Sequence, residues 1–298
     1  MASLPTSKPP APWRPRPEAE AATGVVVTGA NGQVGRALLA RLVGAPVHTV
    51  ALVQGAQYVH ASRLLSGSLH APPSAQALNE ADVIVHLAGA LRPQHPNTYR
   101  AANVHTTQAV AQALRHGRAR RVLFLSYVGA SEASRNAYLR TKAEAERLLA
   151  ATGKEVVVFR CTHIIGPPEA PGPTAEALIA PPTGRVTVLG SGRQLVQPVF
   201  LGDVAAALAA AIEGGVPGTY DLAGPEWMSL DELVTLLNRD RDVRLRHLPG
   251  PLARALARVW PGLPPTLVDL MLRDSVGETQ PAIDAFSLRL TSLRDVWS

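Results

Sequence analysis

Short apolar runs alternate with helical patterns through the first half of the chain. Val25–Val27 form a β-branched run, and Leu38, Leu39 and Leu42 follow at helical spacing. Later patterns predict strands at 47–53, 83–87, 122–126 and 156–160, and helices at 97–115 and 136–150. Strands that alternate with helices imply a parallel sheet covered on both faces. The sequence therefore predicts an α/β fold with a doubly wound parallel sheet of the Rossmann type.

The pattern changes after residue 160. Prolines interrupt a long segment there: Pro167, Pro168, Pro171, Pro173, Pro181 and Pro182. Shorter elements follow, with strands predicted at 186–189 and 220–222, a helix at 203–213, and a helix that starts at Ser229 with the outline of a capping box. We therefore predict a Rossmann domain at 23–165 and a smaller C-terminal substrate-binding lobe at 166–298, partly interleaved with it.

The first 22 residues carry six prolines and no apolar core of the kind that a signal peptide needs. They predict a disordered tail. The single cysteine, Cys161, excludes an intramolecular disulfide and favours a reducing, cytoplasmic compartment. Apolar runs of the length of a membrane span are absent from the sequence.

The chain is basic, with a formal net charge of +6. A nucleic-acid partner is one explanation of such a charge. However, the densest cluster falls at the end of a predicted helix, where cations complement the helix dipole: Arg115, Arg118, Arg120 and Arg121. No nucleic-acid motif and no zinc-ligand spacing accompanies it, so we expect a small-molecule substrate, no nucleic acid and no metal.

A glycine-rich turn joins the first predicted strand to the first helix. Gly29, Gly32 and Gly35 allow a sharp turn and a close approach of backbone N–H groups to a phosphate. Because strand, turn and helix come in the order of a dinucleotide site, we predict that this loop binds a dinucleotide, although a purely structural turn is the alternative. The predicted contacts are Gly29, Asn31, Gly32, Gln33, Val34, Gly35 and Arg36.

Tyr138 and Lys142 lie four residues apart on a predicted helix, and therefore on one face of it. A phenol is a weak acid at neutral pH, and a cation one turn away lowers its pKa. Ser126 ends the preceding strand and has a hydroxyl that can donate to a carbonyl oxygen. The three residues indicate a catalytic site for hydride transfer to a carbonyl, although Tyr and Lys at this spacing also occur on exposed helices.

Together these motifs resemble the short-chain dehydrogenase/reductase superfamily, in its extended and atypical branches. The resemblance rests on the glycine loop, on Leu87-Ala88-Gly89, on Ser126 and on Tyr138-x-x-x-Lys142. Residues 125–146 resemble the atypical NAD(P)-binding group, which includes complex I accessory-subunit-like and NmrA-like proteins. Residues 160–167 are similar to the segment of the extended family, of the NAD-dependent epimerase/dehydratase type, that contacts the nicotinamide.

This resemblance implies a role for each motif residue. Tyr138 would be the general acid/base, Lys142 would bind the nicotinamide ribose and lower the pKa of Tyr138, and Ser126 would orient the substrate carbonyl. The further cofactor contacts would be Leu87, Ala88, Gly89, Asn103, Cys161, Thr162 and Ile164. We expect His86 to be a core histidine rather than a catalyst.

The adenosine end of the predicted site departs from the NAD pattern. The second strand ends at Gln54, where an NAD-preferring protein carries a carboxylate, and Ser68 takes the place of an aspartate beside the adenine. This favours NADP(H) over NAD(H), with Arg36 as a contact to the 2′-phosphate.

The reaction itself stays open among reductase, epimerase and dehydratase, since all would use the same Tyr138 and Lys142 pair. A non-catalytic NADP(H)-binding sensor or assembly protein is the alternative function. The sequence also leaves open a homodimer or another protein partner.

Overall fold

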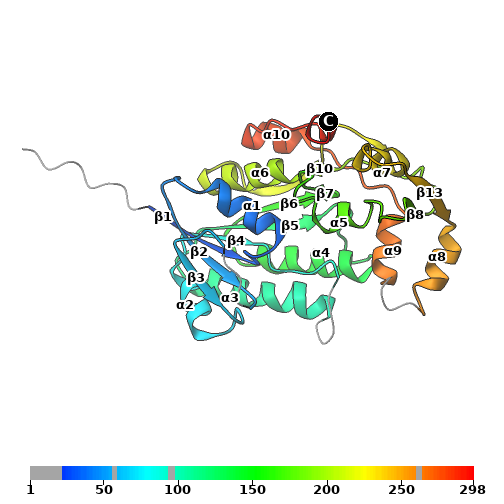
Figure 1. The fold of residues 1–298 in the computed structure, drawn as a ribbon. Coiled ribbons are helices and arrows are strands. Elements are labelled where there is room, and N and C mark those ends of the chain that lie inside the picture. The colour runs from blue at the N-terminus through cyan, green and yellow to red at the C-terminus, as the bar shows by residue number, and fades with distance from the viewer. Residues whose placement is uncertain (1–21, 56–58, 93–97, 260–263) are drawn as a thin grey trace, which may run out of the picture.

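The computed structural model of the chain describes residues 22–55, 59–92, 98–259 and 264–298. The predicted tail at 1–22 therefore lies, apart from residue 22, outside the described residues. The centre of the fold is a parallel sheet of seven strands (Figure 1). Its order is β3 (Arg63–Ser66), β2 (Val47–Val53), β1 (Thr23–Thr28), β4 (Val83–His86), β5 (Arg121–Tyr127), β6 (Glu155–Cys161) and β11 (Gly218–Leu222). The predicted doubly wound α/β fold is confirmed.

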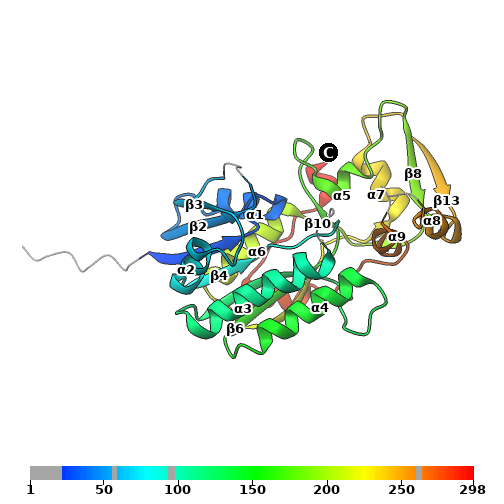
Figure 2. The same ribbon diagram turned by 90° about the horizontal axis from the view of Figure 1, so that it is seen from below.

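Helices cover both faces of the sheet. One face carries α1 (Gln33–Arg41), α6 (Leu201–Glu213) and α10 (Gln280–Phe286); the other carries α2 (Pro72–Glu80), η1 (Arg100–His105), α3 (Thr106–His116) and α4 (Ala137–Ala150). Figure 2 shows α3 and α4 side by side on the second face. Val25 and Val27 pack on the α1 side and Val26 on the other, so every residue of this run is buried. A run without polar alternation is what such a central strand requires.

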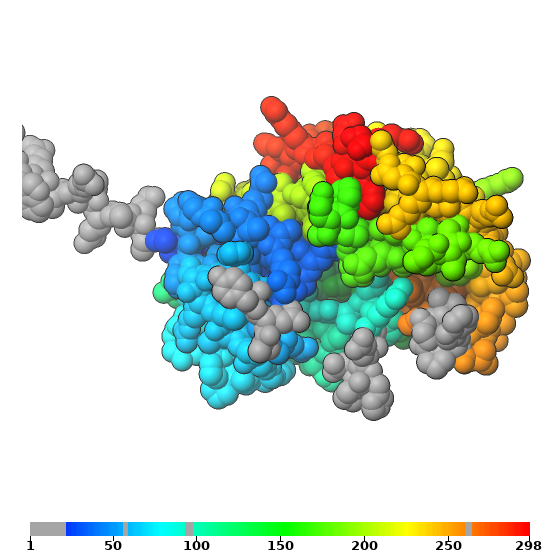
Figure 3. Space-filling model, viewed as in Figure 1, coloured from blue at the N-terminus to red at the C-terminus, as the bar shows by residue number. Residues whose placement is uncertain are grey.

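A smaller lobe lies at the carboxyl ends of the strands of the sheet (Figure 2). It has its own core, which includes Val188, Leu233 and Trp297. Its elements are β7 (Ile164–Ile165), α5 (Gly172–Glu176), β8 (Arg185–Leu189), β9 (Leu195–Val196), β10 (Val199–Phe200), β12 (Met228–Ser229), α7 (Leu230–Leu237), β13 (Arg244–Leu248), α8 (Gly250–Leu256), α9 (Pro265–Met271) and α11 (Leu293–Val296). In Figure 3 the colours pass from blue over the sheet to orange over this lobe.

The two parts of the fold share the chain. After entering the lobe, the chain returns to the sheet with α6 and with β11, which pairs with β6. Phe159 of β6, Tyr220 of β11 and Phe286 of α10 pack ring against ring. The C-terminal half of the sequence therefore completes the sheet as well as building the lobe.

In the first half of the chain, two elements escape the sequence patterns. The edge strand β3 is mostly exposed and has no apolar run, and α2 begins with Pro72 and Pro73, which favour the first turn of a helix although they break its interior. The helix predicted at 97–115 is divided into η1 and α3, and residue 97 lies outside the described part of the chain.

The basic cluster beside β5 has structural partners. Arg118 pairs with Asp82 at 2.8 Å. Arg121 is buried, pairs with Glu155 at 2.8 Å, and donates to the backbone carbonyls of Ala211 and Gly215 at 2.9 Å each. These contacts tie β5 to β6 and to the end of α6, which explains part of the cluster without a ligand.

Candidate active site

The glycine loop follows β1 at the carboxyl edge of the sheet. Gly29 has φ +64, and a Cβ there would lie 2.7 Å from the backbone N of Ala88. A Cβ on Gly35 would lie 2.7 Å from the backbone of Ala30. Only glycine permits this packing, which brings the glycine loop against the residues that follow β4, and α1 against Ala30 after β1. The first N–H groups of α1, after the N-cap Gly32, precede its intrahelical hydrogen bonds and suit a dinucleotide phosphate.

Arg36 and Asn31 lie where the loop approaches the end of β2. Arg36 Nε donates to the backbone carbonyl of Asn31 at 3.0 Å, and Asn31 Nδ2 donates to that of Gln54 at 3.4 Å. The guanidinium group therefore lies in the region where the adenosine ribose of a dinucleotide is expected. Gln33 points the other way, toward the lobe, where its Nε2 donates to the carbonyl of Pro171 at 3.3 Å.

The N-terminus of α4 is fixed by an asparagine cap. Asn136 Oδ1 accepts from the N–H groups of Tyr138 and Leu139, and its Nδ2 donates to the carbonyl of Thr266 at 2.8 Å. The cap sets the rotation of the helix, so that Tyr138 and Lys142 face the end of β5. The Tyr138 ring packs against Tyr99 and Tyr127, with centroids 6.1 and 5.8 Å away. Burial raises the pKa of Tyr138, which leaves its hydroxyl protonated at neutral pH.

Lys142 is buried below Tyr138. Its Nζ donates to the backbone carbonyl of Leu125 at 2.6 Å and lies 4.5 Å from the centroid of the Phe124 ring. Burial lowers the pKa of Lys142 to about 8, against the opposing effect of the Glu146 carboxylate. The ammonium is thus held by a carbonyl and an aromatic face within one turn of Tyr138.

Ser126 lies near the end of β5, and its hydroxyl has a protein partner. Ser126 Oγ donates to Glu146 Oε1 at 2.5 Å, and Glu146 also pairs with Arg160 at 2.6 Å. Neighbouring residues of a strand face opposite sides, so Tyr127 takes the other side, where its hydroxyl lies 3.3 Å from Ser275 Oγ. The Ser126 hydroxyl is thus paired with Glu146, and its role in orienting a substrate carbonyl stays a prediction.

Asn103 lies in the π-helical turn η1 and contacts α4, the helix that carries Tyr138 and Lys142. Its Oδ1 accepts from the N–H of Ala90 and its Nδ2 donates to Thr141 Oγ1, both at 3.1 Å. A Cβ on Gly89 would lie 2.7 Å from Asn103 Oδ1 and 3.6 Å from Lys142 Nζ. The loop after β4 is therefore held directly against Lys142. A π-helical turn at this point is a feature often found at functional sites.

His86 is a core residue, as the sequence predicts. It is fully buried, its Nδ1 lies 2.7 Å from Thr28 Oγ1, and its Nε2 lies 2.9 Å from Thr107 Oγ1. Burial, with a smaller contribution from Lys142, lowers the pKa of His86 to about 3. A neutral histidine with both nitrogens paired has a structural role between β1, β4 and α3.

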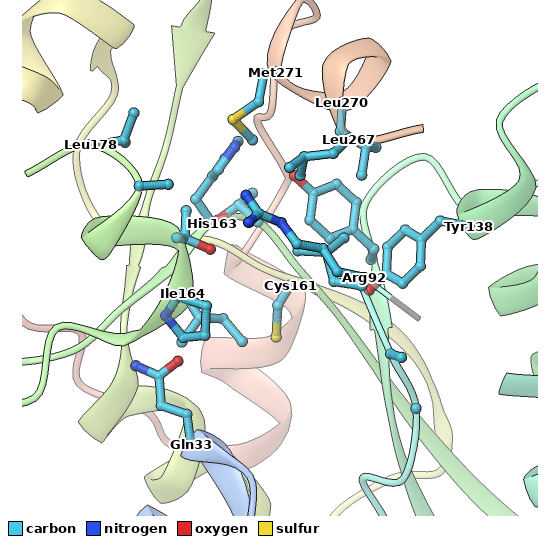
Figure 4. A pocket seen from close by; sticks show the side chains of 18 of the residues that line it. Gln33, Arg92, Tyr138, Cys161, His163, Ile164, Leu178, Leu267, Leu270 and Met271 are labelled. Carbon is cyan, nitrogen blue, oxygen red and sulfur yellow. The ribbon is translucent and has the colours of Figure 1, made fainter. Parts of the chain in front are cut away.

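One cavity of about 720 Å³ unites most of the predicted site residues (Figure 4). Tyr138 lies on one side of it, Gln33 at the end nearest α1, and Leu267, Leu270 and Met271 at the opposite end. The predicted residues that line it are Gln33, Leu87, Gly89, Ser126, Tyr138, Lys142, Cys161, Thr162 and Ile164. Outside this lining, Gly29, Asn31, Gly32 and Ala88 lie in adjoining loops, Val34, Gly35 and Arg36 in the first turn of α1, and Asn103 in η1.

Two buried residues at the end of β6, Cys161 and Thr162, differ in their partners. Burial raises the pKa of the Cys161 thiol, which is therefore protonated and a weak nucleophile. Thr162 is tied to the lobe, since its hydroxyl donates to the carbonyl of Gln197 at 2.5 Å. His163 follows Thr162 and also lines the cavity, and sequence reasoning left it without a role.

Comparison with known proteins identifies the family. The model of the NAD dependent epimerase/dehydratase family matches residues 25–223, and the chain belongs to this family. It is 31% identical over 190 residues to the mitochondrial NADH dehydrogenase [ubiquinone] 1 alpha subcomplex subunit 9 of Arabidopsis thaliana. It is 34% identical over 148 residues to UDP-2-acetamido-2,6-beta-L-arabino-hexul-4-ose reductase of Pseudomonas aeruginosa. These matches span 60% and 48% of this chain, but only 46% and 36% of the two relatives.

Solved structures share the fold over nearly the whole chain. MoeE5 in complex with UDP-glucuronic acid and NAD superposes with a TM-score of 0.74 and 21% identity, over 92% of this chain and 96% of that one. UDP-glucuronic acid 4-epimerase from Bacillus cereus in complex with NAD gives 0.72 and 17%, over the same shares. At these identities the likeness concerns the fold.

Within the described ranges of the chain, helices with the length and apolarity needed to cross a bilayer are absent.

Proposed function

We propose that this protein is an NAD(P)-dependent oxidoreductase that transfers a hydride between a dinucleotide and a carbonyl or alcohol substrate, with Tyr138 as acid/base. The observation that carries the proposal is the meeting of Tyr138, Lys142 and Gly89 at one cavity, next to the glycine loop. Family membership supports an enzyme of this kind.

Tyr138 and Lys142 have different parts in this reaction. The bound dinucleotide supplies or accepts the hydride at the substrate carbon. In the reductive direction Tyr138 gives its proton to the substrate oxygen, and Lys142 stabilises the phenolate that remains. The apolar walls of the cavity exclude water and strengthen this charge interaction. In the oxidative direction the same residues act in reverse.

Exchange of Tyr138 tests the assignment. Tyr138→Phe removes only the hydroxyl, so we expect kcat to fall by about 10²–10⁴-fold, while the dissociation constant of the dinucleotide stays within about twofold. Tyr99→Phe is the matched control, because Tyr99 packs against the same ring and its hydroxyl donates to the carbonyl of Leu91. Equal activity of Tyr138→Phe and wild type on every substrate that turns over would refute the role.

For the cofactor we propose NADP(H) in preference to NAD(H). The support is the missing carboxylate at Gln54 and the position of Arg36 beside that strand end. Calorimetric titration with NADPH and NADH tests the preference. Arg36→Ala should weaken NADPH binding about tenfold or more and leave NADH binding unchanged, whereas Arg147→Ala, on the outer side of α4, should change neither. Tighter binding of NADH by the wild type would overturn this assignment.

A second function is a dinucleotide-binding protein that acts without turnover as part of an assembly. The relative named as a subunit of NADH dehydrogenase favours it. This alternative predicts tight dinucleotide binding, and no turnover by a wild type that retains both Tyr138 and Lys142.

A further inference from the structure

The lobe side of the cavity is almost entirely apolar. Its wall is formed by Leu178, Leu189, Leu248, Leu267, Leu270 and Met271, with smaller apolar neighbours. Among the described residues that line this wall, the polar side chains are those of Thr174 and Thr187, and none is charged. The wall therefore offers a large apolar surface and few hydrogen-bond partners to whatever lies against it.

This wall fits a nucleotide-linked sugar poorly. A diphosphate carries two negative charges, which proteins usually match with arginine, lysine or helix N-termini. Sugar hydroxyls likewise need several donors and acceptors, because a buried hydroxyl without a partner costs about 1–3 kcal/mol. Arg92 and Lys142 are the cationic side chains of the described lining, and both come from the sheet side.

His163 is a polar group in this cavity that the proposed chemistry has not used. It lines the cavity and is only 4% exposed, and neither ring nitrogen has a hydrogen-bond partner among the described residues. Its ring meets Tyr127 edge to face, with centroids 6.2 Å apart, and Tyr127 in turn packs against Tyr138. Burial lowers the pKa of His163 to about 4, so the ring is neutral at physiological pH.

A neutral imidazole presents one N–H donor and one acceptor nitrogen. Leaving both unpaired in a protein interior is unfavourable, so such a group marks a ligand contact when it faces a cavity. His163 directly follows Cys161 and Thr162, which also line the cavity. The imidazole therefore holds an unused donor and an unused acceptor at the border of an otherwise apolar wall.

We propose that the substrate is a predominantly apolar ketone, or the corresponding secondary alcohol, whose oxygen-bearing end is hydrogen-bonded by His163 on the wall shared with Tyr127 and Tyr138. This inference rests on the proposed function, since it names the substrate class of the same site. In reduction, the hydride from the dinucleotide forms the new C–H bond, the carbonyl π bond breaks, and the proton of Tyr138 passes to the oxygen. His163 keeps its own proton and acts in binding.

Binding can be measured without turnover in the complex with the oxidised dinucleotide, because a ketone cannot be reduced by NADP⁺. Calorimetry on the full chain saturated with NADP⁺ would use 2-octanone and UDP-glucose as probes. We expect 2-octanone to bind and UDP-glucose to give no heat of binding. His163→Phe should weaken 2-octanone about tenfold, the value of one hydrogen bond, and His163→Asn, which keeps a donor and an acceptor, should restore most of the affinity.

The outcomes separate this inference from the proposed function. Binding of 2-octanone without reduction by NADPH would refute the oxidoreductase, and with it the ketone as substrate, and would leave only the apolar character of the ligand. Binding and turnover of UDP-glucose, with no affinity for 2-octanone, would overturn the inference and leave the oxidoreductase intact. An unchanged affinity for 2-octanone in His163→Phe would remove His163 from the site. A loss of NADP⁺ affinity in this variant would place His163 against the dinucleotide, which also contradicts the proposal.

Discussion

The Lys142 ammonium lies 4.5 Å from the centroid of the Phe124 ring, on the side of β5 that faces α4. The aromatic face and the Leu125 carbonyl are the groups that hold this buried charge in place. Because burial still lowers the pKa of Lys142 to about 8, its charge is close to titrating under ordinary assay conditions.

The lowered pKa of Lys142 predicts how kcat depends on pH. Lys142 is charged below its pKa and loses the charge as the pH rises through about 8, so kcat for ketone reduction should fall above that pH. Lys142→Arg should move the fall to higher pH, because a guanidinium stays protonated. Stopped-flow or steady-state rates from pH 6 to 10 would measure it, and an identical profile in the two proteins would exclude Lys142 as the titrating group.

The exchange Ser126→Ala should affect stability more than activity. The hydroxyl donates to Glu146, so its loss should lower the free energy of unfolding by about 1 kcal/mol. Because the hydroxyl is already engaged, kcat should stay within about threefold of wild type. Urea unfolding and steady-state kinetics on the same preparation would test both parts. A fall in kcat of a hundredfold or more would return Ser126 to the carbonyl-orienting role.

The glycine loop should not tolerate a methyl group at Gly35. A Cβ there would lie 2.7 Å from Ala30, so Gly35→Ala should lower the free energy of unfolding by about 1–3 kcal/mol and weaken dinucleotide binding. Gly214→Ala is the control, since Gly214 is extended and a Cβ there meets nothing within 4 Å. Equal stability of both variants would contradict the packing of α1 against β1.

Acid should destabilise the fold through His86 and His163, the two buried histidines among the described residues. The pKa of His163 is lowered to about 4 and that of His86 to about 3, so between pH 6.5 and 4 the unfolded chain binds protons that the folded chain does not. Stability therefore falls as the pH falls, by about 3 kcal/mol for each histidine. His163→Phe should remove about half of this fall in urea unfolding series at pH 7 and pH 4.5. An unchanged pH dependence would refute the neutral, buried state of His163.

Local patterns predicted the parallel sheet, the glycine loop and the Tyr138–Lys142 pair, because each depends on spacing over a short stretch of the chain. The partner of Ser126 was not predictable, since Glu146 reaches it only when α4 packs across β5. The same holds for His163. Its sequence position shows a polar residue after a strand, while its unpaired nitrogens and its apolar surroundings arise from the lobe. β3 was missed because most of its residues are exposed. α2 was missed because it begins with two prolines.

The pairing of β11 with β6 determines which fragments of the chain can be produced alone. A fragment that ends at residue 165 would contain the glycine loop, Tyr138 and Lys142, and would still lack α6, α10 and β11. It would leave β6 as a bare edge strand and uncover Phe159, Leu123 and Val27, which are buried in the intact chain. A minimal dinucleotide-binding piece of this protein must therefore extend at least through Phe286, so the nucleotide end and the substrate end cannot be studied as separate polypeptides.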